Sequence, residues 1–435
     1  MAVSLKPYIG TRDFYPVDMQ FRNWMFAIQR QVCEKYAYQN YDTPTLELLD
    51  LYRTKTSEEI VNEQVYSFTD RGDRQVAIRP ELTPSLARIF AARHQDFALP
   101  ARLYNIGRFM RYERPGRGRL REFWQLNVDL LGAPGALAEI EICQLAIEIL
   151  RSYGAKAEHF QLRYSDRRLM ESVLAAPDPS VLQQLSRLID KKDKIKSEEF
   201  DQQLADITDG DKNLIKRVYE LLNLKIASLA HLNSEGRIND EVCQQLSDFA
   251  SVMEASGYKS EICFDPSIAR GFNYYTGFVF EIIDLDPENR RALFGGGRYD
   301  KLIGMLGKQN VAAIGFGMGD VTLENFIRSH KLPVPDPEQR LGIYIALLDQ
   351  KYAPIALEIA RTLRHAGQIV EQGLQPEIKP GKQFQLADRK KRRFVFVLGE
   401  SEIQQNTISV KDLESGQQIQ IGQSELPDWL QSIKA

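Results

Sequence analysis

A stretch rich in arginine is the densest chemical signal in the sequence. Residues 102–122 contain seven arginines against Glu113 and Glu122, a local charge of +5. The planar guanidinium group forms two parallel hydrogen bonds with a phosphate, so the stretch suits a phosphate-bearing ligand. A solvated basic loop is the alternative. The arginines are Arg102, Arg108, Arg111, Arg114, Arg117, Arg119 and Arg121.

Two other stretches suit the binding of a small polar molecule. In RPELT (79–83), Glu81 and Thr83 stand two residues apart, so on a strand they would face the same side and could bind an ammonium group. The stretch RGFNYYTG (270–277) combines an arginine with two tyrosines, whose rings can stack on or hydrogen-bond a planar polar ligand. A polar strand end is the alternative for the first stretch.

Two glycine-rich runs complete the set. GGGRYD (295–300) has three consecutive glycines in a β context, which usually mean that something flat lies against the backbone; a plain turn is the alternative. The second run is GFGMG (315–319). The chain contains neither GxGxxG nor GxxxxGK[ST], which argues against a Rossmann or P-loop nucleotide site. Glycine and arginine stretches at several strand ends favour one composite site on an antiparallel sheet, suited to phosphoryl or nucleotidyl chemistry.

The elements that must position these residues are mainly strands. Two strand-like runs flank the arginine-rich loop, a hairpin precedes it, and an apolar helix follows it. A helical region then interrupts the strands, and a proline-rich linker leads to a βαβ-like tail. The ranges are strands 103–109 and 123–131, hairpin 65–69 and 75–79, helix 136–153, helical region 166–256, strands 261–264 and 277–284, linker 330–340, and tail elements 341–348, 353–366, 394–398 and 407–413.

Composition excludes several classes of protein. The chain has 435 residues, 43% of them hydrophobic, which is ordinary for a globular protein of about three domains. It has no apolar run long enough to span a membrane and no secretory signal, so we expect a cytoplasmic location. Four scattered cysteines and five scattered histidines give no metal-binding spacing, and we expect no metal site built by the protein. The net charge of −3 argues against a generic nucleic-acid binder, yet residues 379–393 carry a local charge of +6.

Taken together, these motifs resemble the histidyl-tRNA synthetase family, a branch of the class II aminoacyl-tRNA synthetases. The resemblance covers nearly the whole chain. It implies an α+β fold, with a class II antiparallel sheet and flanking helices, a helical insertion, and a C-terminal α/β anticodon-binding domain. The motifs are GTRDFYP (10–16), RPELT (79–83), FMRYERPGRGRLREFWQL (109–126), RGFNYYTG (270–277), GGGRYD (295–300), GFGMG (315–319) and the tail stretches 382–402 and 409–413.

The resemblance implies six residues around a bound histidine. Three would receive its α-amino group, two would hydrogen-bond the imidazole nitrogens, and a second tyrosine would lie beside them. A neutral imidazole needs one donor and one acceptor, which a phenol and a carboxylate provide. In that order, the residues are Glu81, Thr83 and Gln125, then Asp129 and Tyr275, then Tyr274.

The resemblance also implies a site for ATP, with Mg²⁺ bound together with the nucleotide. Arg111 would hold the α-phosphate and the amino-acid carboxylate, and Arg270 would stabilise charge at the α-phosphate, so both are expected to be catalytic. Arg119, Gly317 and Gly319 would complete the ATP site.

Two departures from the family pattern stand out. Leu82 replaces the glycine of the usual RPEGT. Thr322 stands where the third class II motif normally has an arginine that binds ATP, and Arg117 or Arg119 is a candidate to compensate.

The implied partners are histidine, ATP and tRNA(His). Lys382, Arg389 and Lys390 are expected to contact the tRNA. The family also implies a homodimer, with the apolar face of residues 21–36 and the Pro44 segment, which resembles the first class II motif, near its interface. The alternative function is a histidine-binding regulatory paralogue, like the regulatory subunit of ATP phosphoribosyltransferase, which does not aminoacylate.

The expected domains follow the same pattern. A catalytic domain in two parts encloses a helical insertion that would clamp the acceptor stem, and the linker leads to the anticodon-binding domain. The ranges are 1–165 and 257–329 for the catalytic parts, 166–256 for the insertion, 330–340 for the linker and 341–435 for the last domain.

Overall fold

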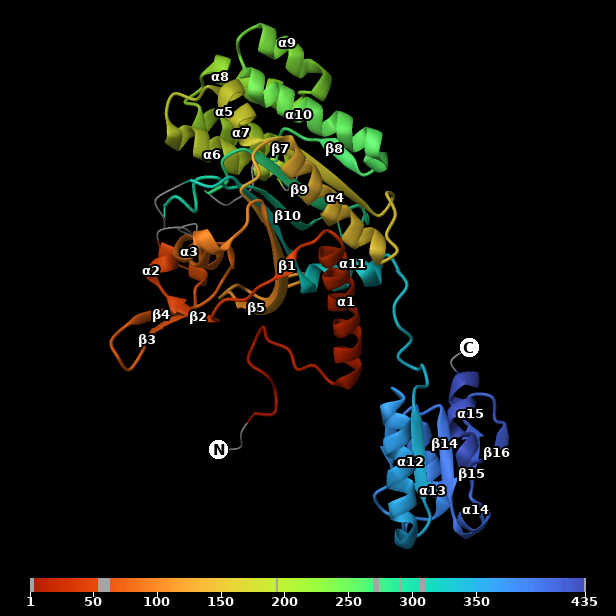
Figure 1. Cartoon of the computed structure of the whole chain (residues 1–435). Helices are drawn as coiled ribbons and strands as arrows, with labels where there is room; N and C mark the ends of the chain where they lie inside the picture. Colours follow the sequence, from red (N-terminus) through yellow and green to blue (C-terminus); the bar gives the residue numbers. More distant parts are fainter. Residues whose placement is uncertain are drawn as a thin grey trace. The chain divides into compact units, whose positions relative to one another are not determined.

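The computed structural model describes residues 4–53, 63–192, 195–268, 274–289, 291–305 and 310–433. Its internal contacts divide the chain into two units, Met1–Val334 and Pro335–Ala435 (Figure 1). None of the described helices is long and apolar enough to span a bilayer. The predicted region 166–256 does not separate from the first unit in this division.

An eight-stranded sheet forms the centre of the first unit. Its neighbours pair antiparallel except at the two edges, where β1 runs parallel to β5 and β8 runs parallel to β7. The two strands predicted to flank the arginine-rich loop are β5 and β6, and they pair along their full length. In spatial order the strands are β1 (Gln39–Asn40), β5 (Ala101–Met110), β6 (Glu122–Leu131), β11 (Ala313–Gly319), β10 (Ala292–Arg298), β9 (Phe278–Asp284), β7 (Phe160–Asp166) and β8 (Ile262–Phe264).

The two faces of this sheet have separate cores. One face packs against α1 (Pro16–Lys35), α4 (Ala136–Ser152) and α11 (Asp320–Ser329), and its core includes Met25 and Phe326. The predicted helix 136–153 is thus confirmed as α4, whose residues are largely apolar and buried. On the opposite face, α3 (Thr83–Ala92) contributes Leu86 and Phe90 to a second, smaller core.

The apolar face of α1 is covered within the chain. Met25 is buried, Trp24 lies edge-on to Tyr153 of the α4 C-terminus, and Phe21 packs against the same core. These contacts account for the apolar pattern of this helix, so the pattern is not evidence for the predicted dimer.

A three-stranded sheet contains the predicted hairpin. β3 (Ser67–Thr69) and β4 (Gln75–Ile78) pair antiparallel, and β2 (Leu46–Leu48) pairs with the other edge of β4. The prediction that Glu81 and Thr83 share a strand face is wrong. β4 ends before Pro80, which has no N–H to donate to a ladder, and Thr83 is the first residue of α3, where Pro84 suits the first turn.

The described residues between β7 and β8 form helices without strands, as the sequence predicted. A polar network joins them to the sheet: Gln245 of α10 donates to buried Glu139 of α4 at 2.9 Å, and Arg298 of β10 donates to the same carboxylate oxygen at 2.7 Å. The helices are α5 (Arg167–Leu174), α6 (Pro179–Asp190), α7 (Ser197–Ile207), α8 (Lys212–Leu222), α9 (Leu229–Ser234) and α10 (Asp240–Met253).

The second unit is a five-stranded mixed sheet with helices, drawn in blue in Figure 1. The predicted tail elements 341–348, 353–366, 394–398 and 407–413 are confirmed as β12, α12, β14 and β15. The strands in spatial order are β13 (Val370–Gln372), β12 (Ile343–Leu347), β14 (Phe394–Leu398), β15 (Thr407–Asp412) and β16 (Gln418–Gly422), and the helices are α12 (Ala353–His365), α13 (Pro380–Arg389), α14 (Glu400–Gln405) and α15 (Leu426–Ser432).

The pairing of β10 with β11 predicts a large effect of one methyl group. A Cβ at Gly296 would lie 2.0 Å from the backbone oxygen of Gly315, so the two strands would have to separate. We expect Gly296→Ala to lower the free energy of unfolding by about 1–3 kcal/mol or more, measured by urea denaturation. The matched control is Gly116→Ala, whose new Cβ meets nothing within 4 Å. Equal stability of the two variants would contradict the close approach of the strands.

Candidate active site

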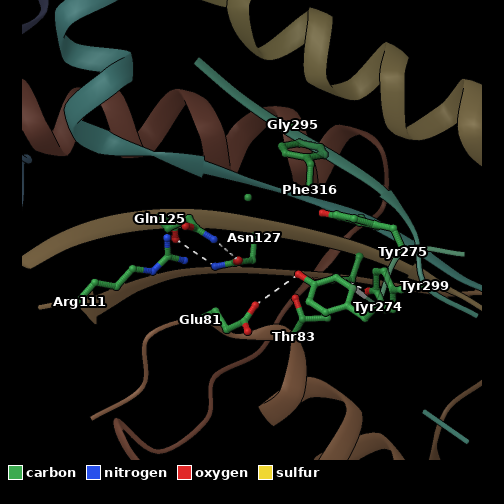
Figure 2. Close-up of a pocket in the computed structure, with 13 residues that line it drawn as sticks. Glu81, Thr83, Arg111, Gln125, Asn127, Tyr274, Tyr275, Gly295, Tyr299 and Phe316 are labelled. Atoms are coloured by element: carbon green, nitrogen blue, oxygen red, sulfur yellow. Dashed lines mark hydrogen bonds between the residues drawn. The ribbon is translucent and has the colours of Figure 1, made fainter. Parts of the chain in front are cut away.

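A pocket opens on the sheet face that carries α3 (Figure 2). Its walls come from the segment before α3, from β6, from the residues before β9, and from the glycine-rich strands β10 and β11. The lining residues are Glu81, Thr83, Arg111, Gln125, Asn127, Asp129, Tyr274, Tyr275, Gly295, Tyr299, Gly315, Phe316 and Gly317.

The alternation of side chains along β6 explains why three polar residues line the pocket. Gln125, Asn127 and Asp129 point to the pocket face, and the intervening Leu126 and Val128 are buried in the core on the opposite face. Gln125 donates from Nε2 to Oδ1 of Asn127 at 2.6 Å, as Figure 2 shows. β6 is therefore the platform of the site.

The glycines of β11 leave the space that these side chains occupy. A Cβ at Gly315 would lie 2.5 Å from Oδ1 of Asp129, and a Cβ at Gly317 would lie 2.2 Å from Nε2 of Gln125. At these two positions the neighbours include the chain's own polar side chains, and the glycines therefore set the orientation of Asp129 and Gln125.

Burial dominates the chemistry of Asp129. Its side chain is almost inaccessible to solvent, and desolvation raises its pKa to about 7. The hydrogen bond from the hydroxyl of Tyr299 favours the carboxylate and opposes this shift. The carboxyl group is thus close to the midpoint of its titration near neutral pH and can serve as an acceptor or a donor.

The opposite wall holds a second buried carboxylate. Glu81 is 3% exposed, and the hydroxyl of Tyr274 donates to its Oε2 at 3.3 Å. Leu82, which replaces a glycine of the family pattern, is fully buried and has φ −99° and ψ −31°, a conformation open to any L-residue. The backbone at this position consequently does not require glycine.

Arg111 carries the positive charge of the pocket. Its Nε donates to the backbone oxygen of Pro80 at 2.9 Å, and its guanidinium lies over the ring of Phe123 at 5.3 Å. Glu113 approaches Nη1 only to 4.0 Å. The guanidinium is held by a neutral acceptor and a ring, so most of its charge remains available to an anionic ligand.

The base of the arginine loop, residues 111–121, is tied to the N-terminal segment. The backbone oxygen of Gly10 accepts from the N–H groups of both Arg121 and Glu122, at 2.8 and 3.1 Å. Asp320, the first residue of α11, accepts from Arg12 at 2.6 Å and from the backbone N–H of Trp124 at 2.9 Å. The GTRDF stretch thereby connects the loop base to β6 and α11.

The structure brings most of the predicted site residues into this pocket. Arg119 and Gly319 are not among the lining residues, and the side chain of Arg119 is 77% exposed in the loop, 3.9 Å from Glu113. Arg270 lies outside the described residues. The predicted residues that do line the pocket are Glu81, Thr83, Arg111, Gln125, Asp129, Tyr274, Tyr275 and Gly317.

Sequence reasoning missed three side chains that line the pocket. Asn127 shows a signal in retrospect, because it is the middle of three polar residues at alternate positions in an otherwise apolar strand. Tyr299 lay in a quoted motif, yet only the fold shows that its hydroxyl reaches Asp129 across 170 residues of sequence. Phe316 gave no chemical signal.

The described residues contain no group of three or more His, Cys, Asp or Glu side chains arranged to hold a metal ion. The carboxylates of the pocket, Glu81 and Asp129, come singly from different elements. This donor set suits a metal ion that arrives on a phosphate ligand better than one held by the protein alone.

The basic stretch of the second unit is largely paired within the fold. Lys390 and Arg392 both contact Glu371, and Lys391 contacts Glu338. Exposed Lys382 and Arg389 on α13 have no ion-pair partner among the residues that the structure describes. The local charge of +6 in the sequence therefore overstates the free positive charge of this surface.

Comparison with known proteins adds independent evidence. A family model described as histidyl-tRNA synthetase matches residues 10–321, and an anticodon binding domain matches residues 342–433. A histidine–tRNA ligase of Leptospira biflexa is 41% identical, covering 99% of this chain and 98% of the relative. A histidine–tRNA ligase of Arabidopsis thaliana, described as chloroplastic/mitochondrial, is 36% identical over 98% of this chain and 86% of its own length.

Solved structures share the fold. The histidyl-tRNA synthetase of Nostoc sp. PCC 7120 superposes with a TM-score of 0.83 at 21% identity, covering 99% of this chain and 100% of that one. A Bacillus halodurans protein described as ATP phosphoribosyltransferase regulatory subunit/histidyl-tRNA synthetase has a TM-score of 0.74 at 21% identity, over 91% of this chain and 99% of that one. At this identity the likeness shows architecture, which is the α+β architecture that the sequence predicted.

The raised pKa of Asp129 predicts a pH dependence of stability. The folded carboxyl has a pKa of about 7, and an unfolded aspartate has one of about 3.9, so the folded state binds the proton more tightly. The stabilisation that comes from this tighter proton binding is fully present below about pH 4 and is lost as the pH rises through 7. Relative to Asp129→Asn, we expect the wild type to lose about 1.4 kcal/mol of unfolding free energy per pH unit within that window.

Urea denaturation at a series of pH values measures this difference. Asp209→Asn is the matched control, because Asp209 is exposed in a left-handed turn that asparagine also adopts. Parallel pH profiles for the wild type and Asp129→Asn would show that the carboxyl does not titrate in this range.

Proposed function

This chain belongs to the histidyl-tRNA synthetase family, and we propose that its pocket activates histidine with ATP and passes it to tRNA(His). One observation carries the proposal: the pocket combines two buried carboxylates, three tyrosines and an arginine on one sheet face. An amino acid with a polar ring and an anionic co-substrate needs this set of partners.

The carboxylates give the two ends of histidine different partners. Glu81, with Thr83 and Gln125, binds the α-ammonium group. Asp129 and Tyr275 bind the two imidazole nitrogens, one as acceptor and one as donor, with Tyr274 beside them. A pocket built this way discriminates strongly against side chains without ring nitrogens, because its buried polar groups would lose their partners.

Arg111 acts at the histidine carboxylate and the α-phosphate of ATP, the two anionic groups that react. A histidine carboxylate oxygen attacks the α-phosphorus of ATP, the bond to the β-phosphate oxygen breaks, and pyrophosphate leaves. Arg111 orients the two anions and stabilises the charge on the α-phosphate, and Arg270 is proposed to stabilise charge at the same phosphate. Mg²⁺ bound with ATP neutralises part of the triphosphate charge.

Transfer to tRNA completes the reaction. A hydroxyl of the 3′-terminal ribose attacks the acyl carbon of histidyl-adenylate, AMP leaves with the bonding electrons of the acyl–oxygen bond, and the hydroxyl proton passes to the phosphate of the leaving AMP. We propose that the helices between β7 and β8 hold the acceptor stem and that the second unit binds the anticodon, in keeping with its anticodon-domain match. The ranges 1–165, 166–256 and 257–329 for the first unit stay a prediction, as do the homodimer and a cytoplasmic location.

Histidine-dependent exchange of labelled pyrophosphate into ATP tests the proposal. We expect exchange with histidine and none with other amino acids, followed by charging of tRNA(His). Histidine binding without exchange would favour the regulatory paralogue instead.

The histidine subsite makes a sharper prediction. Glu81→Gln keeps the size of the side chain and removes the charge that pairs with the ammonium group. We expect the KM for histidine to rise by about 10-fold or more, with the KM for ATP changed much less. Arg93→Gln, at an exposed position outside the pocket, is the control. Equal effects on both substrates would contradict a role in binding the amino acid.

The structure of the second unit predicts that its basic residues contribute unequally to tRNA(His) binding. Because Lys382 and Arg389 are exposed and Lys390 is paired with Glu371, we expect Lys382→Ala and Arg389→Ala each to weaken tRNA(His) binding and to reduce the slope of log K against log salt by about 1. Lys390→Ala should reduce it less. Filter binding at several salt concentrations measures these slopes, and a larger loss at Lys390 would overturn the ranking.

A further inference from the structure

Arg291, immediately before β10, makes an unexpected contact with the arginine loop. Its Nη1 donates to the backbone oxygen of Arg117 at 2.8 Å, joining residues that are 174 positions apart. The site residues predicted from the sequence did not include Arg291. The contact places its guanidinium at the turn of the loop that lies next to the pocket strands.

Thr322 meets the same turn of the loop. Its Oγ1 donates to the backbone oxygen of Leu293 at 2.9 Å, two residues after Arg291, and its Cγ2 lies 3.5 Å from where a Cβ of Gly118 would stand. The threonine hydroxyl therefore joins α11 to β10 and carries no charge. Arg291, Thr322 and the turn at Arg117–Gly118 thus form one corner, beside strands whose Gly295 and Gly317 line the pocket.

Two other arginines near this corner lie close to carboxylates. Arg12 pairs with Asp320 at 2.6 Å and with Glu324 at 3.6 Å. Arg119 lies 3.9 Å from Glu113. Within the described part of the chain, Arg291 has no carboxylate partner, and its one printed acceptor is a neutral carbonyl. A phosphate oxygen is a stronger acceptor for a guanidinium than a carbonyl is, so a nucleotide would displace this bond.

We propose that Arg291 binds the polyphosphate of ATP and supplies the cation that Thr322 cannot. The inference deepens the proposed function, since it assigns a further ATP-binding residue to the same site. It also adds a candidate for compensation: the sequence suggested Arg117 or Arg119 of the loop, and the structure points to Arg291, which precedes β10 and bonds to the loop backbone.

Two substitutions distinguish whether Arg291 binds ATP through its charge or only supports the arginine loop. Arg291→Gln keeps an N–H donor and removes the charge, and Arg291→Lys keeps the charge. We expect the Gln variant to raise the KM for ATP by about 10-fold or more and the Lys variant to raise it only a few-fold. The KM for histidine should stay within about 2-fold in both. Arg93→Gln is again the matched control, and thermal unfolding checks that each variant folds.

Direct binding gives the second readout. In an equilibrium titration, Arg291→Gln should weaken the binding of ATP much more than the binding of AMP, because AMP lacks the β- and γ-phosphates. The proposal would be overturned if the Gln variant lost equal affinity for ATP and AMP. It would also be overturned if the KM for ATP of this variant were like that of the wild type, or if its KM for histidine rose equally. Pyrophosphate exchange by the wild type tests the proposed function separately, so failure of the one is distinguishable from failure of the other.

Discussion

The site depends on glycines of β11 that lie beside the polar residues of β6. Gly315 and Gly317 leave Asp129 and Gln125 room to stand upright from β6, and a methyl group at either glycine would occupy their positions. Gly296 brings β10 into close contact with β11 in the same way. Close packing leaves few alternatives for side chains held like this, so the orientation of the polar groups is set by the sheet before any ligand arrives.

The same arrangement separates charge within a small volume. Burial keeps Asp129 and Glu81 away from water, and tyrosine hydroxyls bind both carboxylates. Arg111 is held by a backbone oxygen and a phenylalanine ring, with Glu113 only at 4.0 Å, so most of its charge remains available. Groups fixed in this way need no reorganisation when a charged substrate binds, which is the condition under which electrostatic stabilisation is strongest.

Local pattern predicted the elements of this fold well. Strand-like runs on both sides of the arginine loop predicted β5 and β6, the apolar run 136–153 predicted α4, and the change of texture after residue 166 predicted a run of helices. The strand predicted at Thr83 was wrong although the signal is local: Pro84 suits the first turn of a helix, and Thr83 begins α3. Tertiary context decides how much of the basic stretch is free, since Lys390 at the end of α13 pairs with Glu371 of β13. Tyr299 and Arg291 were out of reach for a further reason, since their partners lie 170 and 174 residues away. No local pattern encodes such contacts, and the resemblance to a family supplied the roles that spacing alone could not.

The tie between Trp124 and Asp320 joins residues 196 positions apart, and it has a consequence for synthesis of the protein. β6 is made early, whereas its neighbour β11 ends only at Gly319. A ribosome must therefore extend the chain through the whole helical segment before β6 can pair with β11, its second neighbour in the sheet. During that interval one edge of β6 lacks its final neighbour, and an incomplete chain released then exposes an apolar strand edge prone to aggregation. Long-range pairing of this kind also makes assembly of the sheet slow compared with that of the helices.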